Sequence, residues 1–288
     1  MTYEAAALVL LSALLHPFRD LLLKGHEHPE SAYLAVIAGW IVIAPVHALA
    51  TGASLVLPAN VMLLAIVSAS CLTAYYFGTM AALKSGDLSI YYPIIRSSPL
   101  LIVLVTWLFA GTSYSPVVLV GIALIVVASF ALQRQPGRLI AQPKTAALAF
   151  LAMAGSAGYT IADAKAMMEV SPAPFLFWAN SMVTLAFMAL TLLFKPADRS
   201  VRIHLTGGWS QTPLRIAAAS VTSYLSYLCI LTAFGLGAGA AETAAMRQAS
   251  IPVSVVLAAL IVGEKRFLNR LSWASLIALG IVLMVLNR

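Results

Sequence analysis

The sequence predicts an all-α integral membrane protein with ten transmembrane helices. Of its 288 residues, 61% are hydrophobic and only 9% are charged, whereas a soluble domain has roughly 25% charged residues. The apolar residues form continuous runs of about 20 residues, the length with which an α-helix spans the hydrocarbon core of a bilayer. Strands are excluded because these runs do not alternate and an open sheet cannot satisfy its backbone in lipid. Most of the chain must therefore lie in the membrane.

Ten apolar blocks are the expected helices. Glycine and proline mark most breaks between them, for example Gly52 with Pro58. The connection from Lys195 to Thr212 is the longest, and we expect it to be a solvated surface loop. The first block has no basic segment before it and no small-residue cleavage site after it, so it is expected to be a retained helix. The blocks cover residues 4–23, 31–50, 57–83, 88–110, 114–132, 144–168, 173–194, 212–236, 239–261 and 269–286.

An internal repeat relates the two parts of the chain. A shift of 151 residues pairs Arg96 with Arg247 and Tyr76 with Tyr227. Apolar segments also align by chance, but the registered arginine, tyrosine and glycine pairs favour a true duplication. The same shift pairs Gly86 with Gly237, and a shift of 153 pairs Pro99 with Pro252.

The repeat divides the chain into residues 1–135 and 143–288, each with five expected helices. Because five is odd, the second unit would enter the membrane the other way up and form an inverted repeat. Secondary transporters commonly have this architecture, with the substrate site near the midplane between the repeats.

Two arginines lie inside expected helices, Arg96 in the fourth and Arg247 in the ninth. An arginine at this depth costs at least ~2.5 kcal/mol on insertion scales, so it must face protein, water or an anion. A guanidinium group grips a carboxylate, phosphate or phosphonate through two hydrogen bonds, so both residues are candidates to bind an anionic substrate group. The alternative is that each neutralises an acid, such as Glu242 or Asp163, and only joins helices.

Polar residues accompany both arginines at helical spacing, which places each set on one face. Such a stripe is typical of the wall of a water-filled cavity, and Tyr92 and Ser250 become candidate binding residues. The two stripes are Ser89, Tyr92, Arg96 and Pro99, and Thr243, Arg247, Ser250 and Ser254.

The remaining ionisable residues have two interpretations each. Glu242 is five residues before Arg247, on another face of the helix, and either reaches Arg96 or carries a coupling proton. His16, before a proline, is either proton-responsive or hydrogen-bonded to a neighbouring helix. Asp20 and Asp163, which a shift of 143 residues pairs, are expected to form interfacial ion pairs.

Five aromatic residues are candidates to line a pocket for an organic ligand. Aromatic side chains in membrane helices also pack between helices or anchor at the interface, which is the alternative for each of them. They are Tyr76, Tyr92, Tyr159, Trp178 and Tyr227.

The chain resembles the drug/metabolite transporter superfamily of the EamA type over essentially its whole length. The resemblance rests on the two five-helix units and on Gly263-Glu264-Lys265-Arg266 before a last helix ending Ala-Leu-Gly-Ile-Val-Leu. The first unit has Ala110-Gly111 instead of Gly-Glu. The resemblance implies a carrier in the cytoplasmic membrane, often an exporter of amino acids, other metabolites or drugs. The run from His16 to Lys24 is similar to a subgroup of which some members are associated with phosphonate use.

The charge distribution bears on location and partners. The net charge of +7 lies mostly in connecting loops, where it favours contact with anionic lipid over nucleic acid. Lysine and arginine concentrate in the odd-numbered connections, so the positive-inside rule places both termini outside. Many relatives are drawn with both termini inside, opposite to this count. We expect a multi-pass protein of a bacterial inner membrane, as a monomer or weak homodimer.

The sequence contains no motif for catalysis, a metal or a cofactor: no Gly-Lys-Ser/Thr phosphate loop and no Gly-x-Ser-x-Gly elbow. We therefore expect gradient-driven transport of a small anionic or zwitterionic metabolite by alternating access, with a proton as a candidate coupling ion. The alternatives are an exporter of amphipathic or cationic drugs with structural arginines, and a non-transporting scaffold or lipid-handling subunit.

Overall fold

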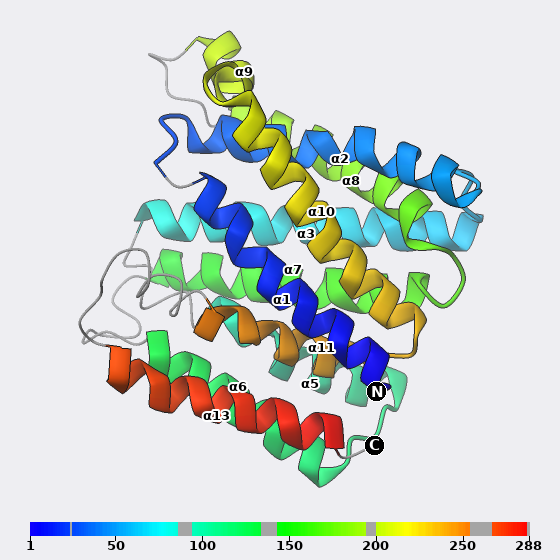
Figure 1. Ribbon diagram of the computed structural model, residues 1–288, viewed down its shortest axis with the longest axis vertical. Coiled ribbons are helices and arrows are strands. Elements are labelled where there is room, and N and C mark those ends of the chain that lie inside the picture. The colour runs from blue at the N-terminus through cyan, green and yellow to red at the C-terminus, as the bar shows by residue number, and fades with distance from the viewer. Residues whose placement is uncertain (24, 86–93, 134–142, 194–199, 254–266, 287–288) are drawn as a thin grey trace.

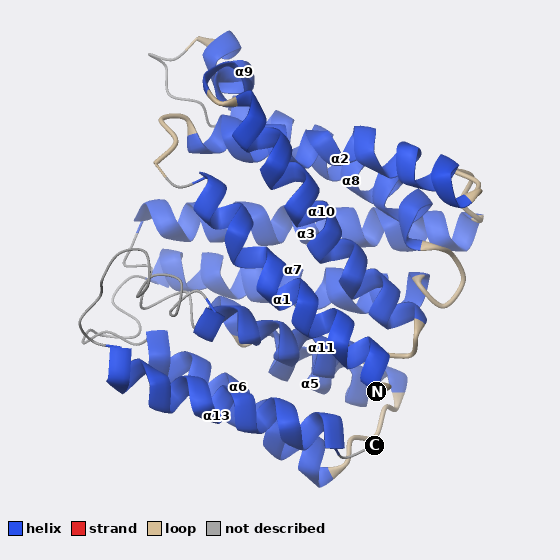
Figure 2. Ribbon diagram, viewed as in Figure 1, coloured by secondary structure: helices blue, strands red, loops and turns tan. Residues whose placement is uncertain are grey.

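The structure, a computed structural model, describes residues 1–23, 25–85, 94–133, 143–193, 200–253 and 267–286. Every regular element in these ranges is a helix, as Figure 2 shows. Six of the described helices are long and apolar enough to cross a membrane, judged by length and composition. The sequence-based prediction of an all-α, multi-pass membrane protein is therefore confirmed at this level.

The six long helices are α1 (Tyr3–Leu23), α2 (Pro29–Thr51), α3 (Ala59–Ser85), α7 (Pro143–Ala166), α8 (Pro172–Leu193) and α10 (Pro213–Gly235). Three shorter helices are also apolar: α5 (Ser98–Ala110), α6 (Pro116–Gln133) and α13 (Phe267–Leu286). The others are α9 (Val201–Gln211) and α11 (Ala240–Met246), which continues into the 3₁₀ turn η1 (Arg247–Ala249).

Proline and glycine fix many helix ends. Proline is the first residue of α2, α6, α7, α8 and α10, a position where its missing N–H costs nothing. Gly52 after α2 and Gly111 after α5 have φ of 68° and 62°, the left-handed conformation that closes a helix and that glycine adopts without strain. These breaks agree with the turn signals in the sequence.

The helices pack in pairs around a common interior. The most extensive pairs are α3 with α7, α1 with α10, α6 with α13 and α2 with α8. In Figure 1, α1 and α10 run side by side across the face of the bundle in front of α3 and α7. Glycines permit the close pairs: a Cβ atom on Gly155 of α7 would lie 2.5 Å from the carbonyl oxygen of Cys71 on α3.

Predictions for three elements are wrong in detail, and one of them is the block 88–110, whose described part is interrupted at Ser97. Residues 201–211, expected to belong to a surface loop, form α9, which packs against α2. A Cβ atom on Gly207 would lie 2.7 Å from the His28 ring, so this glycine allows α9 to approach the start of α2. The expected continuous helix 239–261 is interrupted in its described part, because the α-helix gives way to η1 at Arg247.

Candidate functional site

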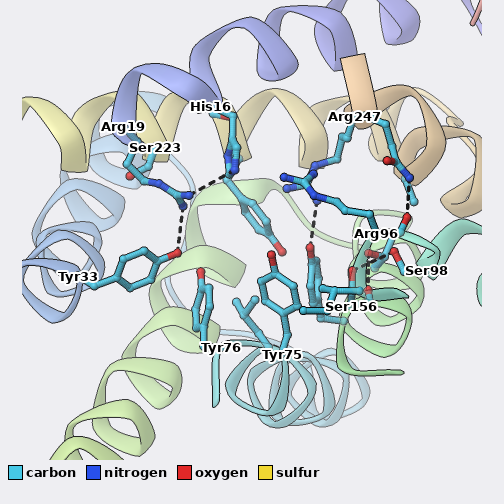
Figure 3. Close-up of a pocket in the computed structure, with 18 of the residues that line it drawn as sticks. His16, Arg19, Tyr33, Tyr75, Tyr76, Arg96, Ser98, Ser156, Ser223 and Arg247 are labelled. Atoms are coloured by element: carbon cyan, nitrogen blue, oxygen red, sulfur yellow. Dashed lines mark hydrogen bonds between the residues drawn. The ribbon is translucent and has the colours of Figure 1, made fainter. Parts of the chain in front are cut away.

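A cavity of about 80 Å³ lies between α1 and α10 on one side and α3 and α7 on the other. Residues of α2, α5, α11 and η1 complete its lining. A single water molecule needs about 10–15 Å³ by this kind of measure, so the cavity has room for several waters or a small ligand. Six of the ten predicted binding residues line it: His16, Tyr76, Arg96, Tyr159, Tyr227 and Arg247. Figure 3 shows this site with most of its lining residues as sticks.

Arg247, the first residue of η1, is held by aromatic groups. Its Nη1 donates a hydrogen bond to the Tyr159 hydroxyl at 3.1 Å, and its guanidinium carbon lies 6.0 Å from the centre of the Tyr227 ring. Within the described part of the chain, Arg247 forms no ion pair with Glu242 or Asp163. Tyrosine contacts, rather than a direct ion pair with either of these acids, therefore hold the Arg247 cation at the cavity wall.

Arg96 also lies at an interruption of a helix. Residues 94–96 are helical, a turn follows at Ser97, and α5 begins at Ser98 with Pro99 as its second residue. The N–H of Leu100 donates to the Ser97 oxygen at 3.1 Å, in place of the Arg96 oxygen that an unbroken α-helix would use. The Arg96 carbonyl instead accepts a hydrogen bond from Gln248 Nε2 at 2.5 Å.

Gln248 therefore joins the two interruptions that carry the arginines. It is 2% exposed and lines the cavity, and its Oε1 has no hydrogen-bond partner among the described residues. Sequence reasoning missed this residue. Its position one residue after Arg247, within a polar run of a predicted helix, was the available signal.

Replacing Gln248 with leucine should lower the stability of the folded protein. The change leaves the partly buried Arg96 carbonyl without this donor, which costs up to about 1–3 kcal/mol. Thermal denaturation of the purified protein in detergent measures the effect. The matched control is Gln211→Leu, which removes an exposed bond of 2.7 Å to Glu27 and should leave the midpoint nearly unchanged. Equal midpoints for the two variants would contradict the structural role of Gln248.

Arg19 of α1 is a third arginine at the cavity, and it was not among the binding residues predicted from the sequence. Its Nη1 donates to the Tyr33 hydroxyl at 3.1 Å, and its guanidinium carbon lies 5.3 Å from the Tyr33 ring centre. Its Nη2 is 3.3 Å from His16 Nε2. Because a guanidinium group only donates, the imidazole accepts at Nε2 and carries its proton on Nδ1. The i, i+4, i+7 spacing of Ser12, His16 and Arg19 was a signal for a polar face.

Tyrosine rings form one wall of the cavity. The centres of the Tyr33 and Tyr76 rings are 5.3 Å apart, those of Tyr75 and Tyr76 5.4 Å, and those of Tyr75 and Tyr159 6.0 Å. The chain of rings ends at Tyr227, 6.4 Å from Tyr159. In Figure 3 the hydroxyl groups of Tyr75 and Tyr76 point toward the arginine side chains. The wall thus supplies neutral hydrogen-bond donors beside the three cations.

Asp163 is buried in the bundle, so the prediction of an interfacial ion pair is wrong for it. Its side chain is 1% exposed. Its Oδ1 accepts a hydrogen bond of 2.5 Å from Ser68 Oγ on α3, and its Oδ2 accepts one from the hydroxyl of Tyr227 on α10. It follows Ser156, Tyr159 and Thr160 at helical spacing. This polar stripe on α7 was the sequence signal for a cavity-facing helix.

Four predicted binding residues are not among those that line the cavity. Trp178 is 37% exposed and its Nε1 donates to the Leu55 oxygen at 2.8 Å. Glu242 lies in the first turn of α11. Ser250 is 4% exposed on another face, because the segment turns Ala244, Arg247 and Gln248 toward the cavity. Tyr92 lies outside the described residues, as do Ser89, Ser254 and the Gly263-Glu264 motif.

The fold and the site define the class as a helical, multi-pass membrane protein with a polar cavity inside the helix bundle. No family model matches the chain, and no curated protein matches it. A protein of known crystal structure is similar in fold, with a TM-score of 0.75 over 99% of this chain and 97% of that chain. The two sequences are 17% identical, so the similarity concerns the fold alone.

Proposed function

We propose that the protein is a secondary active transporter of a small anionic or zwitterionic metabolite, such as an amino acid or phosphonate. The observation that carries this proposal is the meeting of Arg19, Arg96 and Arg247 at one cavity among apolar helices. Guanidinium groups inside a membrane protein are costly and default to a functional role. Their planar donor arrays suit carboxylate, phosphate and phosphonate groups.

The cavity favours a small anion over an amphipathic or cationic drug. Three guanidinium groups make the binding of a cation in the cavity electrostatically unfavourable. Arg247 also forms no ion pair with a carboxylate in the described residues. The volume of about 80 Å³ is well below the roughly 300–1,000 Å³ of a site for a drug-sized ligand. The unpartnered acceptor Gln248 Oε1 adds a place for a donor from water or from a zwitterionic substrate.

The proposed architecture is ten transmembrane helices in two inverted units, residues 1–135 and 143–288, as in transporters of the EamA type. The positions of Arg96 and Arg247 support it, because each lies where a helix is interrupted. Interrupted helices near a midplane site are a feature of inverted-repeat transporters. The start of α1 and the end of α13 also lie at the same edge of the bundle, as an even number of crossings requires (Figure 1).

In this proposal alternating access carries the substrate across a bacterial inner membrane, with export as the net direction. Transport draws on an ion or solute gradient, and the protein works as a monomer or a weak homodimer. An unchanged midplane site would open alternately to the two sides as the units rock against each other.

Flux into proteoliposomes that contain only the purified protein tests the proposal. The panel consists of labelled amino acids, phosphonates, sugar phosphates and cationic drugs. We expect saturable uptake of one anionic or zwitterionic class, and competition by its close analogues. Saturable uptake of cationic drugs alone would favour the drug exporter. No saturable flux of any compound would favour a scaffold or lipid-handling subunit.

A further inference from the structure

We infer that Asp163 binds the coupling proton of the transporter, and that Tyr227 transmits the presence of this proton to an anion in the cavity. The inference rests on the proposed function, because it concerns the same cavity, but it assigns the coupling step to residues beyond the arginines. Asp163 does not itself line the cavity, whereas Tyr227 does.

The surroundings of Asp163 suit a group that gains and loses a proton. A buried carboxylate is costly when charged unless hydrogen bonds and a cation compensate it. Asp163 receives two hydrogen bonds, from Ser68 and Tyr227, and forms no ion pair within the described chain. The surroundings therefore stabilise the charged form of Asp163 only in part, and they can also accommodate its neutral form.

In the described part of the chain, few ionisable groups lie near Asp163. Among the described groups, Tyr227 of α10 contacts Asp163 directly, Cys71 of α3 and Arg247 of η1 are close enough to act on it electrostatically, and Tyr159 lies one turn away on α7. Arg247 is a cation that acts on Asp163 electrostatically, and the same guanidinium group lies over the Tyr227 ring. The proton site and the anion site therefore share both Arg247 and Tyr227.

The hydrogen-bond roles supply the coupling. With Asp163 ionised, the Tyr227 hydroxyl hydrogen is directed to Oδ2 and is not available to the cavity. A proton bound at Oδ2 makes Asp163 a donor, and Tyr227 then accepts this hydrogen bond with its oxygen. The phenolic hydrogen is released and can point to an anion beside Arg247. One proton bound at Asp163 thus adds one hydrogen-bond donor to the anion site.

Proton and anion should consequently bind cooperatively and cross the membrane together, so net export requires an outward anion gradient that outweighs the inward proton gradient. A hydrogen bond to a charged group contributes about 1.5–3 kcal/mol, so the added donor should strengthen anion binding about 10-fold to 100-fold. By linkage, a bound anion strengthens proton binding at Asp163 by the same factor.

Infrared difference spectra of the purified protein, recorded without ligand between about pH 8 and about pH 5.5, test the proton site directly. We expect a band from a protonated carboxyl group in the wild type and its loss in Asp163→Asn, the isosteric mimic of the neutral acid. The control Glu169→Gln, an exposed acid bonded to Asn60, should keep the band. A wild-type band that persists in Asp163→Asn, or no band in the wild type, would overturn the assignment.

Binding of sulfate, whose charge is constant over this pH range, tests the coupling. Thermal shifts should give an affinity about 10-fold higher at the lower pH in the wild type. Asp163→Asn should bind with similar affinity at both pH values. Tyr227→Phe keeps the ring but removes the hydroxyl, and it should lose the pH dependence while it keeps the infrared band of Asp163.

The outcomes separate this inference from the proposed function. Sulfate binding to the wild type that is lost in Arg247→Gln would support the anion site. If Asp163→Asn then keeps the wild-type pH dependence of sulfate binding, only the role of Asp163 is refuted. If sulfate fails to bind the wild type at either pH, the anion site itself fails and the coupling falls with it.

Discussion

Replacement of Arg247 with alanine should abolish saturable uptake of the substrate into proteoliposomes. The variant loses a charged group that offers two hydrogen bonds to an anion, each worth about 1.5–3 kcal/mol, so a fall in flux of at least ~100-fold is expected. Arg247→Lys keeps the charge but not the planar pair of donors, and should restore only a small fraction of the flux. Arg96→Ala should behave like Arg247→Ala, because both guanidinium groups line the same cavity.

The control for these variants is Arg215→Ala. Arg215 is exposed near the start of α10, where it donates to the Leu22 oxygen at 2.6 Å, outside the cavity lining. It should transport at close to the wild-type rate. Thermal denaturation distinguishes loss of function from loss of folding. Wild-type flux in both Arg96→Ala and Arg247→Ala would refute the anion site.

The second large effect is expected at Gly155, where the backbones of α7 and α3 pack closely. A methyl group there would lie 2.5 Å from the Cys71 carbonyl oxygen and 2.7 Å from the Tyr75 backbone nitrogen. Backbone atoms cannot rotate away, so Gly155→Ala must separate the helices. Overpacking typically costs about 1–3 kcal/mol, and here it also displaces Tyr75 from the cavity wall. Both the denaturation midpoint and the flux should fall.

Gly158, one turn further along α7, provides the matched comparison. An added Cβ atom there would meet the side chain of Cys71, with Sγ at 2.6 Å, rather than backbone. Gly158→Ala combined with Cys71→Ala should therefore regain most of the stability, whereas Cys71→Ala should not rescue Gly155→Ala. Gly235→Ala, whose nearest contact would be 3.6 Å, should change little. Rescue of Gly155→Ala by Cys71→Ala would show that the helices do not meet as described.

The apolar pattern of the sequence predicted most of the described helices to within a few residues. Runs of about 20 apolar residues carry this information locally. The failure at α9 has a physical cause, since residues 201–211 include two glycines and few apolar side chains, and their helix packs against α2. Tertiary contact, which no local pattern reports, accounts for that element.

The site was partly predictable for the same reason. Arg96 and Arg247 stand out because charge is rare in apolar runs, and both line the cavity. Asp163 was assigned to the interface because it lies near the end of a helix, and Arg19 was not predicted to bind substrate. Their actual partners, Tyr33 and Tyr227, come from other helices and depend on how the helices cross. Such pairings are set by packing and cannot be read from spacing along one segment.

The contact between Gln248 and the main chain at Arg96 has a mechanical consequence. It ties two kinked segments that are 152 positions apart in the chain. While this hydrogen bond is formed, a tilt of one segment moves the other with it. The two guanidinium groups then keep their separation. An anion bound by both arginines would then stay in a rigid site while the surrounding helices move. The cavity could open to one side of the membrane and then to the other without loss of these contacts.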